Sequence, residues 1–140
     1  METPHVALDV EIPSDVKYIE GVVELAARQC RELHLPPQKC SLNVPVALSE
    51  ALSNAILRGN REGNDKHVRV RAFVSEDALV FDVSDEGPDF DMVAERIDPT
   101  TPDKVMLEQG RGLFLMHRLM DQVEHIRDHG NVVRLTLRRQ

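Results

Sequence analysis

The sequence predicts a single α/β domain of the α+β type, a two-layer sandwich in which helices cover a mixed, mostly antiparallel sheet. Two observations lead to this fold class. A chain of 140 residues with 41% hydrophobic residues has the size of one domain, and it buries roughly 68–70% of its unfolded surface without needing disulfides or a structural metal. The predicted strands come in neighbouring pairs, which favours antiparallel hairpins over a doubly wound parallel sheet. We therefore treat residues 1–140 as one domain.

The first half of the chain contains one predicted strand and two predicted helices. Apolar and polar residues alternate over residues 6–12, as in a strand with one buried face. Apolar residues then recur at helical spacing over residues 16–33, until Pro36-Pro37 ends the pattern. A second helix is expected over residues 43–57, because Pro45 is tolerated in a first helical turn.

The second half begins with a predicted hairpin, whose strands cover residues 68–74 and 79–84. The following loop is rich in Asp, Glu, Pro, Thr and Gly, and it is too long for an ordinary connection, so we expect a mobile lid at about residues 92–109. A helix is expected to open at Gly110. The chain then ends in two strands, at residues 123–127 and 132–137.

Charge and composition exclude several classes of partner and site. The chain has 17 Lys and Arg against 24 Asp and Glu, a formal net charge of −7, so we expect no direct binding to nucleic acid. No apolar run approaches the ~20 residues that span a bilayer, which predicts a cytoplasmic protein without a membrane contact. Cys30 and Cys40 form no CxxC pair, and we expect buried, reduced thiols. His125 and His129 lack a third ligand nearby and predict no metal site.

The first candidate site feature is the pair Glu50 and Asn54 in the second predicted helix. Residues four apart stack on one face of a helix, and the opposite side is filled by apolar residues. This pattern has two readings, a solvated helix face or a narrow polar stripe that lines a site. The spacing alone does not separate them.

The second feature is Asp85-Glu-Gly-Pro-Asp-Phe90, directly after a predicted strand. A carboxylate at a strand end presents hydrogen-bond acceptors, which suit an exocyclic amine such as that of adenine. Gly87 lets a flat ligand approach the backbone closely. The alternative is an ordinary acidic turn, because Asp, Gly and Pro are common turn residues.

The third feature is the glycine pair Gly110-Arg-Gly112 after the long loop. At a helix start, free N–H groups and the positive end of the helix dipole form an anion site, and glycines let phosphate oxygens come close. The alternative is a flexible hinge. The segment is neither a Walker A loop nor a Rossmann fingerprint.

In this order, the three features resemble the GHKL ATPases, the superfamily of DNA gyrase and the histidine kinases. Two runs, Glu50-Ala-Leu-Ser-Asn-Ala-Ile-Leu-Arg-Gly-Asn60 and Gly110-Arg-Gly-Leu-Phe-Leu-Met-His-Arg-Leu-Met-Asp121, are similar to bacterial anti-sigma factor serine kinases of partner-switching systems. The resemblance covers nearly the whole chain. It implies the Bergerat fold, ATP and Mg²⁺ as cofactors, and a homodimer that binds a sigma factor and phosphorylates a STAS-domain anti-anti-sigma protein.

The resemblance also implies roles for individual residues. Asn54 matches the residue that holds Mg²⁺, and Glu50 matches the base that accepts the hydroxyl proton of the substrate. Asp85 matches the adenine-reading carboxylate, with Gly87 beside it. The residues expected near the phosphates are Lys104, Gly110, Arg111 and Gly112.

Two positions depart from the family pattern. Asp89 stands where the family has a second glycine, which places a Cβ and a negative charge near the expected nucleotide. Arg58 stands where the family commonly has histidine. Two hypotheses follow, an active kinase or a nucleotide-binding or nucleotide-free switch module that sequesters a partner without phosphorylating it. A fragment of a sensor histidine kinase is disfavoured, because too few residues precede the Glu50 helix for a phosphoacceptor hairpin.

Overall fold

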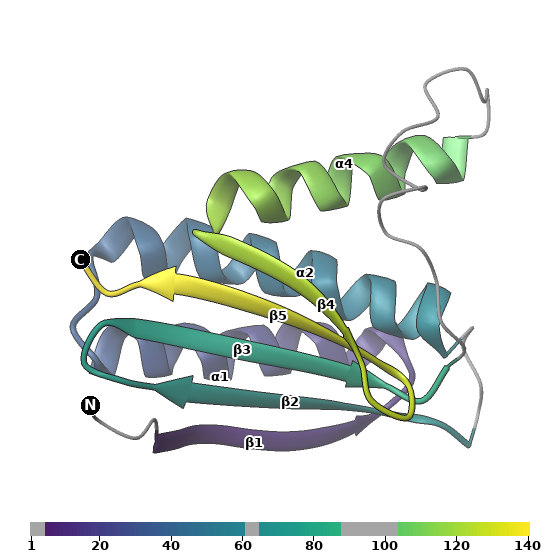
Figure 1. Ribbon diagram of the computed structural model, residues 1–140, viewed down its shortest axis with the longest axis horizontal. Coiled ribbons are helices and arrows are strands. Elements are labelled where there is room, and N and C mark those ends of the chain that lie inside the picture. Colours follow the sequence, from purple (N-terminus) through teal and green to yellow (C-terminus); the bar gives the residue numbers. More distant parts are fainter. Residues whose placement is uncertain (1–4, 61–64, 88–103) are drawn as a thin grey trace.

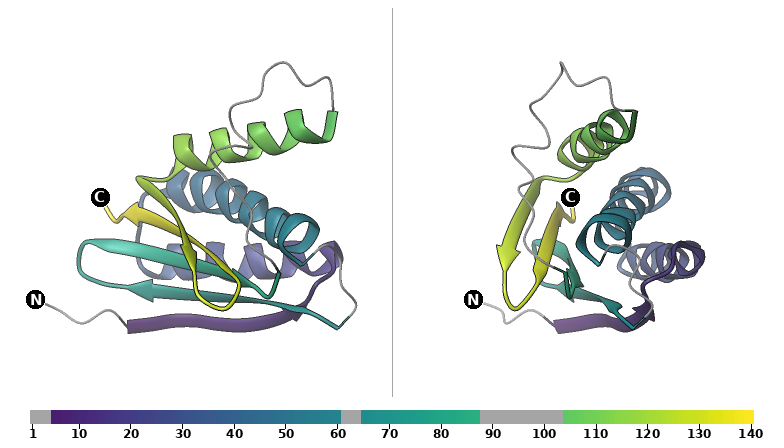
Figure 2. Two further views of the ribbon diagram at one scale, coloured as in Figure 1. Left: turned by 45° about the vertical axis from the view of Figure 1, so that its right-hand side comes forward. Right: turned by 90° about the vertical axis from the view of Figure 1, so that its right-hand side faces the viewer.

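A computed structural model of the protein shows two layers, a curved sheet with helices on one face (Figures 1 and 2). It describes residues 5–60, 65–87 and 104–140, with the backbone alone for residues 104–111. The strands are β1 (His5–Pro13), β2 (His67–Val74), β3 (Ala78–Asp85), β4 (Gln122–Arg127) and β5 (Asn131–Arg138). They form a 5-stranded sheet in the order β1-β2-β3-β5-β4, with every neighbouring pair antiparallel. The described sheet is thus antiparallel throughout instead of mixed.

The helical layer follows the predicted chain order, with different ends for two of its members. It consists of η1 (Val16–Tyr18), α1 (Ile19–Glu32), η2 (Lys39–Asn43), α2 (Val44–Asn54), η3 (Ala55–Gly59) and α4 (Lys104–Leu119). The helix expected over residues 43–57 is α-helical only as far as Asn54, because wider π-helical turns flank it as η2 and η3. The helix expected to open at Gly110 begins at Lys104, so the predicted helix start was wrong.

The core lies between the sheet and the helices, and it follows from the alternation in the strands. Val68, Val70 and Ala72 of β2 are fully buried, whereas the residues between them face away from the helices. On α2, the alanines at 47 and 51 are fully buried, which lets this helix approach its neighbours closely. Cys30 and Cys40 are free and buried, as predicted. Burial, with a hydrogen bond to Cys40, raises the pKa of the Cys30 thiol to about 12.

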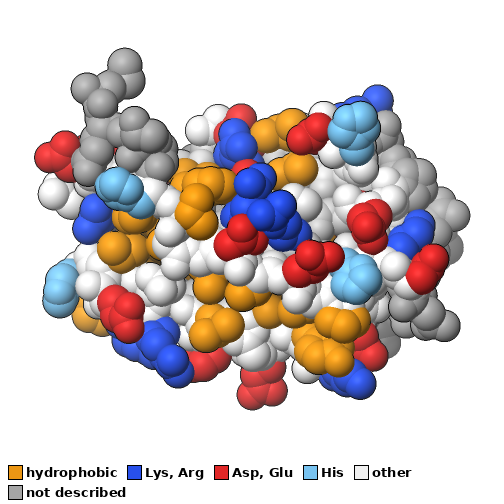
Figure 3. Space-filling view, turned by 90° about the horizontal axis from the view of Figure 1, so that it is seen from below, with side chains coloured by type: hydrophobic (Ala, Val, Ile, Leu, Met, Phe, Trp, Pro, Cys, Tyr) orange, Lys and Arg blue, Asp and Glu red, His pale blue; other side chains and the backbone are white. Residues whose placement is uncertain are grey.

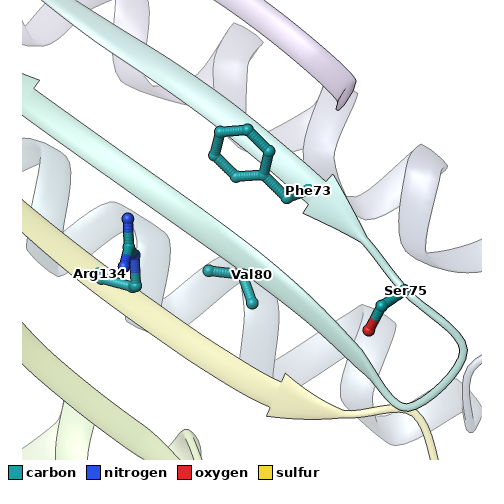
Figure 4. A pocket seen from close by; sticks show the side chains of 4 residues that line it. All are labelled: Phe73, Ser75, Val80 and Arg134. Atoms are coloured by element: carbon teal, nitrogen blue, oxygen red, sulfur yellow. The ribbon is translucent and has the colours of Figure 1, made fainter. Parts of the chain in front are cut away.

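The other face of the sheet carries charged pairs. Arg134 binds the buried Asp82 through two hydrogen bonds of 2.8 and 2.9 Å, and Arg69 binds Asp9 in the same way. A pocket of about 300 Å³ lies on this face. Figure 4 shows the residues that line it, Phe73, Ser75, Val80 and Arg134. The view from below in Figure 3 shows charges of both signs interspersed with hydrophobic side chains.

Both hairpin turns fall where the sequence predicts them. Between β2 and β3, the backbone N–H of Ser75 donates to the carbonyl of Ala78 at 2.9 Å. Between β4 and β5, His129 and Gly130 have φ values of 56° and 145°. A Cβ at Gly130 would overlap the carbonyl oxygen of Asp85, so the glycine lets this turn lie against the end of β3. Among the described helices, none is both long and apolar enough to cross a membrane.

Candidate functional site

Helix α2 carries the predicted polar stripe. Its buried side consists of apolar residues, while Glu50, Ser53 and Asn54 are half-buried on the other side. The predicted arrangement of one polar and one apolar side is confirmed, and the stripe is partly enclosed instead of fully solvated. Neither the Glu50 nor the Asn54 side chain has a hydrogen bond to another part of the chain that the structure describes.

The carboxylate of Glu50 lies against α4. A Cβ at Gly112 would come within 2.5 Å of Glu50 Oε2, so the missing side chain at 112 makes room for this carboxylate. Burial raises the pKa of Glu50 above its ordinary value, because the charged form loses water and gains no described donor. A carboxylate with a raised pKa is a better proton acceptor.

Asn60, a buried residue without a predicted role, joins the end of the α2–η3 segment to residues at or next to the ends of β1, β2 and β3. Its Nδ2 donates to the carbonyl of His67 at 2.9 Å and to Ser14 Oγ at 3.2 Å. Its Oδ1 accepts from the backbone N–H of Glu86 at 2.8 Å. Asn60 therefore holds the start of β2 and the turn after β3 in place. Arg58, half-buried near this end, also has an interaction partner.

Asp85 is the last residue of β3, and it is 6% exposed. Its Oδ1 accepts hydrogen bonds from the backbone N–H of Gly87 at 2.9 Å and from Asn131 Nδ2 at 3.0 Å. Burial raises the pKa of Asp85, and these hydrogen bonds, with the charge of His125, oppose the rise. The turn after β3 thus holds a carboxylate that is buried and directed by donors, unlike an ordinary solvated acidic turn.

Two glycines bring η3 against the end of β3. A Cβ at Gly59 would overlap the Asp85 carboxylate, and a Cβ at Gly87 would overlap the carbonyl oxygen of Gly59. The sequence predicts that Gly87 lets a ligand approach the backbone closely. The structure adds a packing reason, because the backbones of residues 59 and 87 touch.

The predicted phosphate-binding segment lies inside helix α4. Because the helix begins at Lys104, Gly110 and Gly112 fall in its interior, where backbone N–H groups donate to carbonyls one turn earlier. In this conformation the two glycines therefore do not lie at a helix N-terminus, and the predicted helix-start anion site is not present among the described residues. The side chains of Lys104 and Arg111 lie outside the described residues, as does Asp89. Of the lid predicted at about residues 92–109, residues 92–103 also lie outside the described residues, whereas residues 104–109 form the first turns of α4 and are not a loop.

The structure arranges the predicted residues along one helical segment. Glu50 lies at one end of it beside Gly112, and Gly59 lies at the other end beside Asp85 and Gly87. Gly59 follows Glu50 by nine positions, which would extend about 13 Å at the rise of an α-helix and less where η3 is π-helical. We call Asp85, Gly87, Gly59 and Asn131 the base end, after the adenine base that the resemblance predicts beside Asp85. We call Glu50, Asn54 and Gly112 the Glu50 end. Asn131 has no local signal in the sequence, since its partner Asp85 is 46 residues away.

Comparison with known proteins identifies a family and several named relatives. The histidine kinase-like ATPase domain family matches residues 12–137. The chain is 31% identical over 134 residues to the serine-protein kinase RsbW of Bacillus velezensis, covering 92% of this chain and 83% of the relative. It is 30% identical over 130 residues to RsbW of Bacillus subtilis, covering 89% and 80%.

An anti-sigma F factor of Clostridium beijerinckii is 28% identical over 99 residues, which cover 70% of this chain and 69% of the relative. The resemblance drawn from the two sequence runs and the expected α+β fold are confirmed, because the family match spans both runs, all of β2, β3 and β4, β5 up to residue 137, and the last two residues of β1. The chain belongs to the histidine kinase-like ATPase domain family.

Proposed function

We propose that this protein is an ATP-dependent serine/threonine-protein kinase and anti-sigma factor. It phosphorylates a STAS-domain anti-anti-sigma protein and sequesters a sigma factor. The observation that carries the proposal is the half-buried Glu50 carboxylate, set along one helical segment from the buried Asp85 carboxylate. The relatives named serine-protein kinase and anti-sigma F factor support the same activity.

The base end fits an adenine nucleotide. Asp85 offers a buried acceptor for an exocyclic amine, and Gly59 and Gly87 leave no side chain over it. Half-buried Asn54, without a described hydrogen bond, offers an amide oxygen of the kind that Mg²⁺ binds. When bound, ATP supplies the phosphoryl group, and Mg²⁺ neutralises charge on the phosphates.

Glu50 acts as the general base in this proposal. One of its carboxylate oxygens would accept the proton of the substrate hydroxyl while the hydroxyl oxygen bonds to the γ-phosphorus of ATP, and the bond from that phosphorus to the bridging oxygen would break to release ADP. The raised pKa of Glu50 brings its basicity closer to the operating pH, which is favourable for a base. The carboxylate fits at the contact between α2 and α4 because Gly112 has no side chain there.

The segment before Leu113 completes the phosphate site. We propose that residues 92–109 close over the nucleotide and that Lys104, Gly110, Arg111 and Gly112 face the phosphates. Because the two glycines lie inside α4, their N–H groups reach phosphate oxygens only if the first turns of this helix unwind. Glycine favours such a change, since it stabilises a helix less than other residues except proline.

The proposal includes the assembly that the resemblance implies, a homodimer that acts in the cytoplasm, where sigma factors direct transcription. Sedimentation of the purified protein tests the dimer. A monomer at all concentrations would remove this part without affecting the kinase proposal.

The decisive experiment combines binding and transfer. Calorimetry with Mg-ATP should show binding by the wild type, and Asp85→Asn should weaken it by about 1–3 kcal/mol, because the amide presents a donor where an acceptor is needed. Incubation with labelled ATP and a STAS-domain protein should then yield a phosphoserine or phosphothreonine, identified by mass spectrometry.

The outcomes separate the two hypotheses. Binding without transfer to any STAS-domain protein that forms a complex with this chain would favour the switch module. Absence of ATP binding by the wild type would reject the nucleotide site, and unchanged affinity in Asp85→Asn would reject the role of Asp85.

A further inference from the structure

A row of three polar side chains runs from Asp85 toward β4. Asn131, the first residue of β5, is 1% exposed and is the strand partner of Asp85. Its Nδ2 donates to Asp85 Oδ1 at 3.0 Å, and its Oδ1 lies 2.9 Å from His125 Nε2. A buried amide requires partners for both its donor and its acceptor, and this row supplies them.

The Asp85 carboxylate determines which group donates and which accepts in each hydrogen bond of the row. An ionised carboxylate only accepts hydrogen bonds, so Asn131 must turn its NH₂ group toward Asp85 and its oxygen toward His125. His125 must then carry a proton on Nε2 and donate it to Asn131 Oδ1. The opposite amide orientation would place two oxygens against each other.

The row also affects the protonation state of the Asp85 carboxyl group. Burial disfavours the charged form of Asp85, and the Asn131 amide is the largest of the contributions that oppose this effect. A carboxyl group that became protonated would present an O–H donor, which repels an amine and suits a carbonyl oxygen. The donor from Asn131 therefore favours the form of Asp85 that accepts.

We propose that Asn131 is a positioning residue that holds Asp85 as an acceptor for the base, and that His125 acts one step behind it by orienting the Asn131 amide. The row thereby selects 6-amino purine nucleotides over 6-oxo purine nucleotides. This inference rests on the proposed nucleotide site. It concerns two residues to which neither the sequence motifs nor the comparisons assign a role.

Base selectivity tests the inference directly. Affinities for ATP and for inosine triphosphate, both with Mg²⁺, are measured by calorimetry on the wild type, Asn131→Leu, His125→Leu and His125→Gln. Asn131→Leu should lower the ratio of ATP to inosine triphosphate affinity by about tenfold or more, and His125→Leu by about threefold to tenfold, as expected for a lost buried hydrogen bond. His125→Gln keeps an N–H donor in this place and should restore the ratio to within about twofold.

Asn43→Leu is the matched control for a general loss of stability. Asn43 Nδ2 donates to the carbonyl of Leu119 at 2.8 Å, a part-buried bond that joins η2 to the end of α4 and does not involve Asp85. This variant should unfold at a lower temperature with an unchanged selectivity ratio. A ratio that falls as much in Asn43→Leu would show a general effect of destabilisation and would overturn the inference.

The remaining outcomes are separable. No ATP binding by the wild type overturns the proposed function together with the inference. Wild-type binding with unchanged ratios in Asn131→Leu and His125→Leu overturns the inference alone. Equal loss in His125→Leu and His125→Gln overturns the donor role of His125, and this pair decides the question by itself if Asn131→Leu does not fold.

Discussion

The base end and the Glu50 end share one helical segment, but the protein holds them differently. At the base end, Asp85 Oδ1 accepts two hydrogen bonds, and the Asn131 amide uses both its donor and its acceptor. At the Glu50 end, Glu50 and Asn54 make no side-chain hydrogen bond to the described residues. A closed network suits selective recognition of a base. Side chains without a hydrogen-bond partner among the described residues suit groups that meet a metal ion, phosphates and a substrate hydroxyl.

The largest expected effect is a loss of phosphoryl transfer without a loss of ATP binding, when the Glu50 end alone is changed. Glu50→Gln keeps the shape of the side chain but cannot accept a proton, so phosphoryl transfer should fall by about 10²–10⁴-fold while ATP affinity stays near the wild-type value. Single-turnover transfer and calorimetry measure the two quantities. Full transfer activity in this variant would leave Glu50 as a helix-face residue and remove the distinction in function between the ends.

The second prediction concerns a substitution that overpacks the base end. In Gly59→Ala, the new Cβ overlaps the Asp85 carboxylate, and we expect a loss of about 1–3 kcal/mol in the free energy of unfolding together with weaker ATP binding. Gly21→Ala is the matched control, since a Cβ at this α1 position has no atom within 4 Å. It should raise stability by about 0.5–1 kcal/mol. Equal stability of the two variants in urea would contradict the tight approach of η3 to β3.

The third prediction measures how firmly α4 holds the Glu50 end. Gly112→Ala should destabilise the wild type, because its Cβ comes within 2.5 Å of Glu50 Oε2, but it should be tolerated in a Glu50→Ala background. The double-mutant cycle in urea should give a coupling free energy of about 0.5–3 kcal/mol. Additive effects would mean that the Glu50 carboxylate moves away from Gly112 without resistance.

The smallest effect is a pH dependence of stability. Burial raises the pKa of Glu50 in the folded state, so the protein is favoured at low pH and loses stability as pH rises from the ordinary value of 4.5 through the folded-state pKa. Glu50→Gln does not titrate, and its stability relative to the wild type should increase over this pH range. Asp85 titrates in both proteins and cancels in the difference. Urea unfolding from pH 4 to 7 measures the difference in the free energy of unfolding between Glu50→Gln and the wild type. A difference that stays constant over this pH range would contradict the raised pKa of Glu50.

Local patterns account for what the sequence predicted well. The apolar alternation in β2 and the helical spacing in α1 and α2 report which face of each element is buried, and this information lies within a few residues of each position. The stacking of Glu50 and Asn54 is equally local, because helix geometry alone places residues four apart on one face.

The start of α4 shows where a local pattern misled. Two glycines at 110 and 112 suggested a helix beginning, yet residues 104–109 are mostly good helix formers and α4 runs through both glycines. Packing of α4 on α2 compensates for the weak helix propensity of glycine at these positions. The roles of Lys104, Arg111 and Asp89 stay predictions, because their side chains lie outside the described residues.

The sequence by itself determined the fold class, the chain order of the elements and the three motifs, since each depends on residues that are near neighbours in the chain. Only the tertiary structure decided how the site is supported. Asn60 reaches Ser14, and Asn131 reaches Asp85, across 46 residues each. Gly59 and Gly87 meet because η3 and β3 come together in the folded chain. Such contacts depend on strand register and helix packing, which no single segment encodes, and burial then makes each unpaired polar group costly enough that these partners are required.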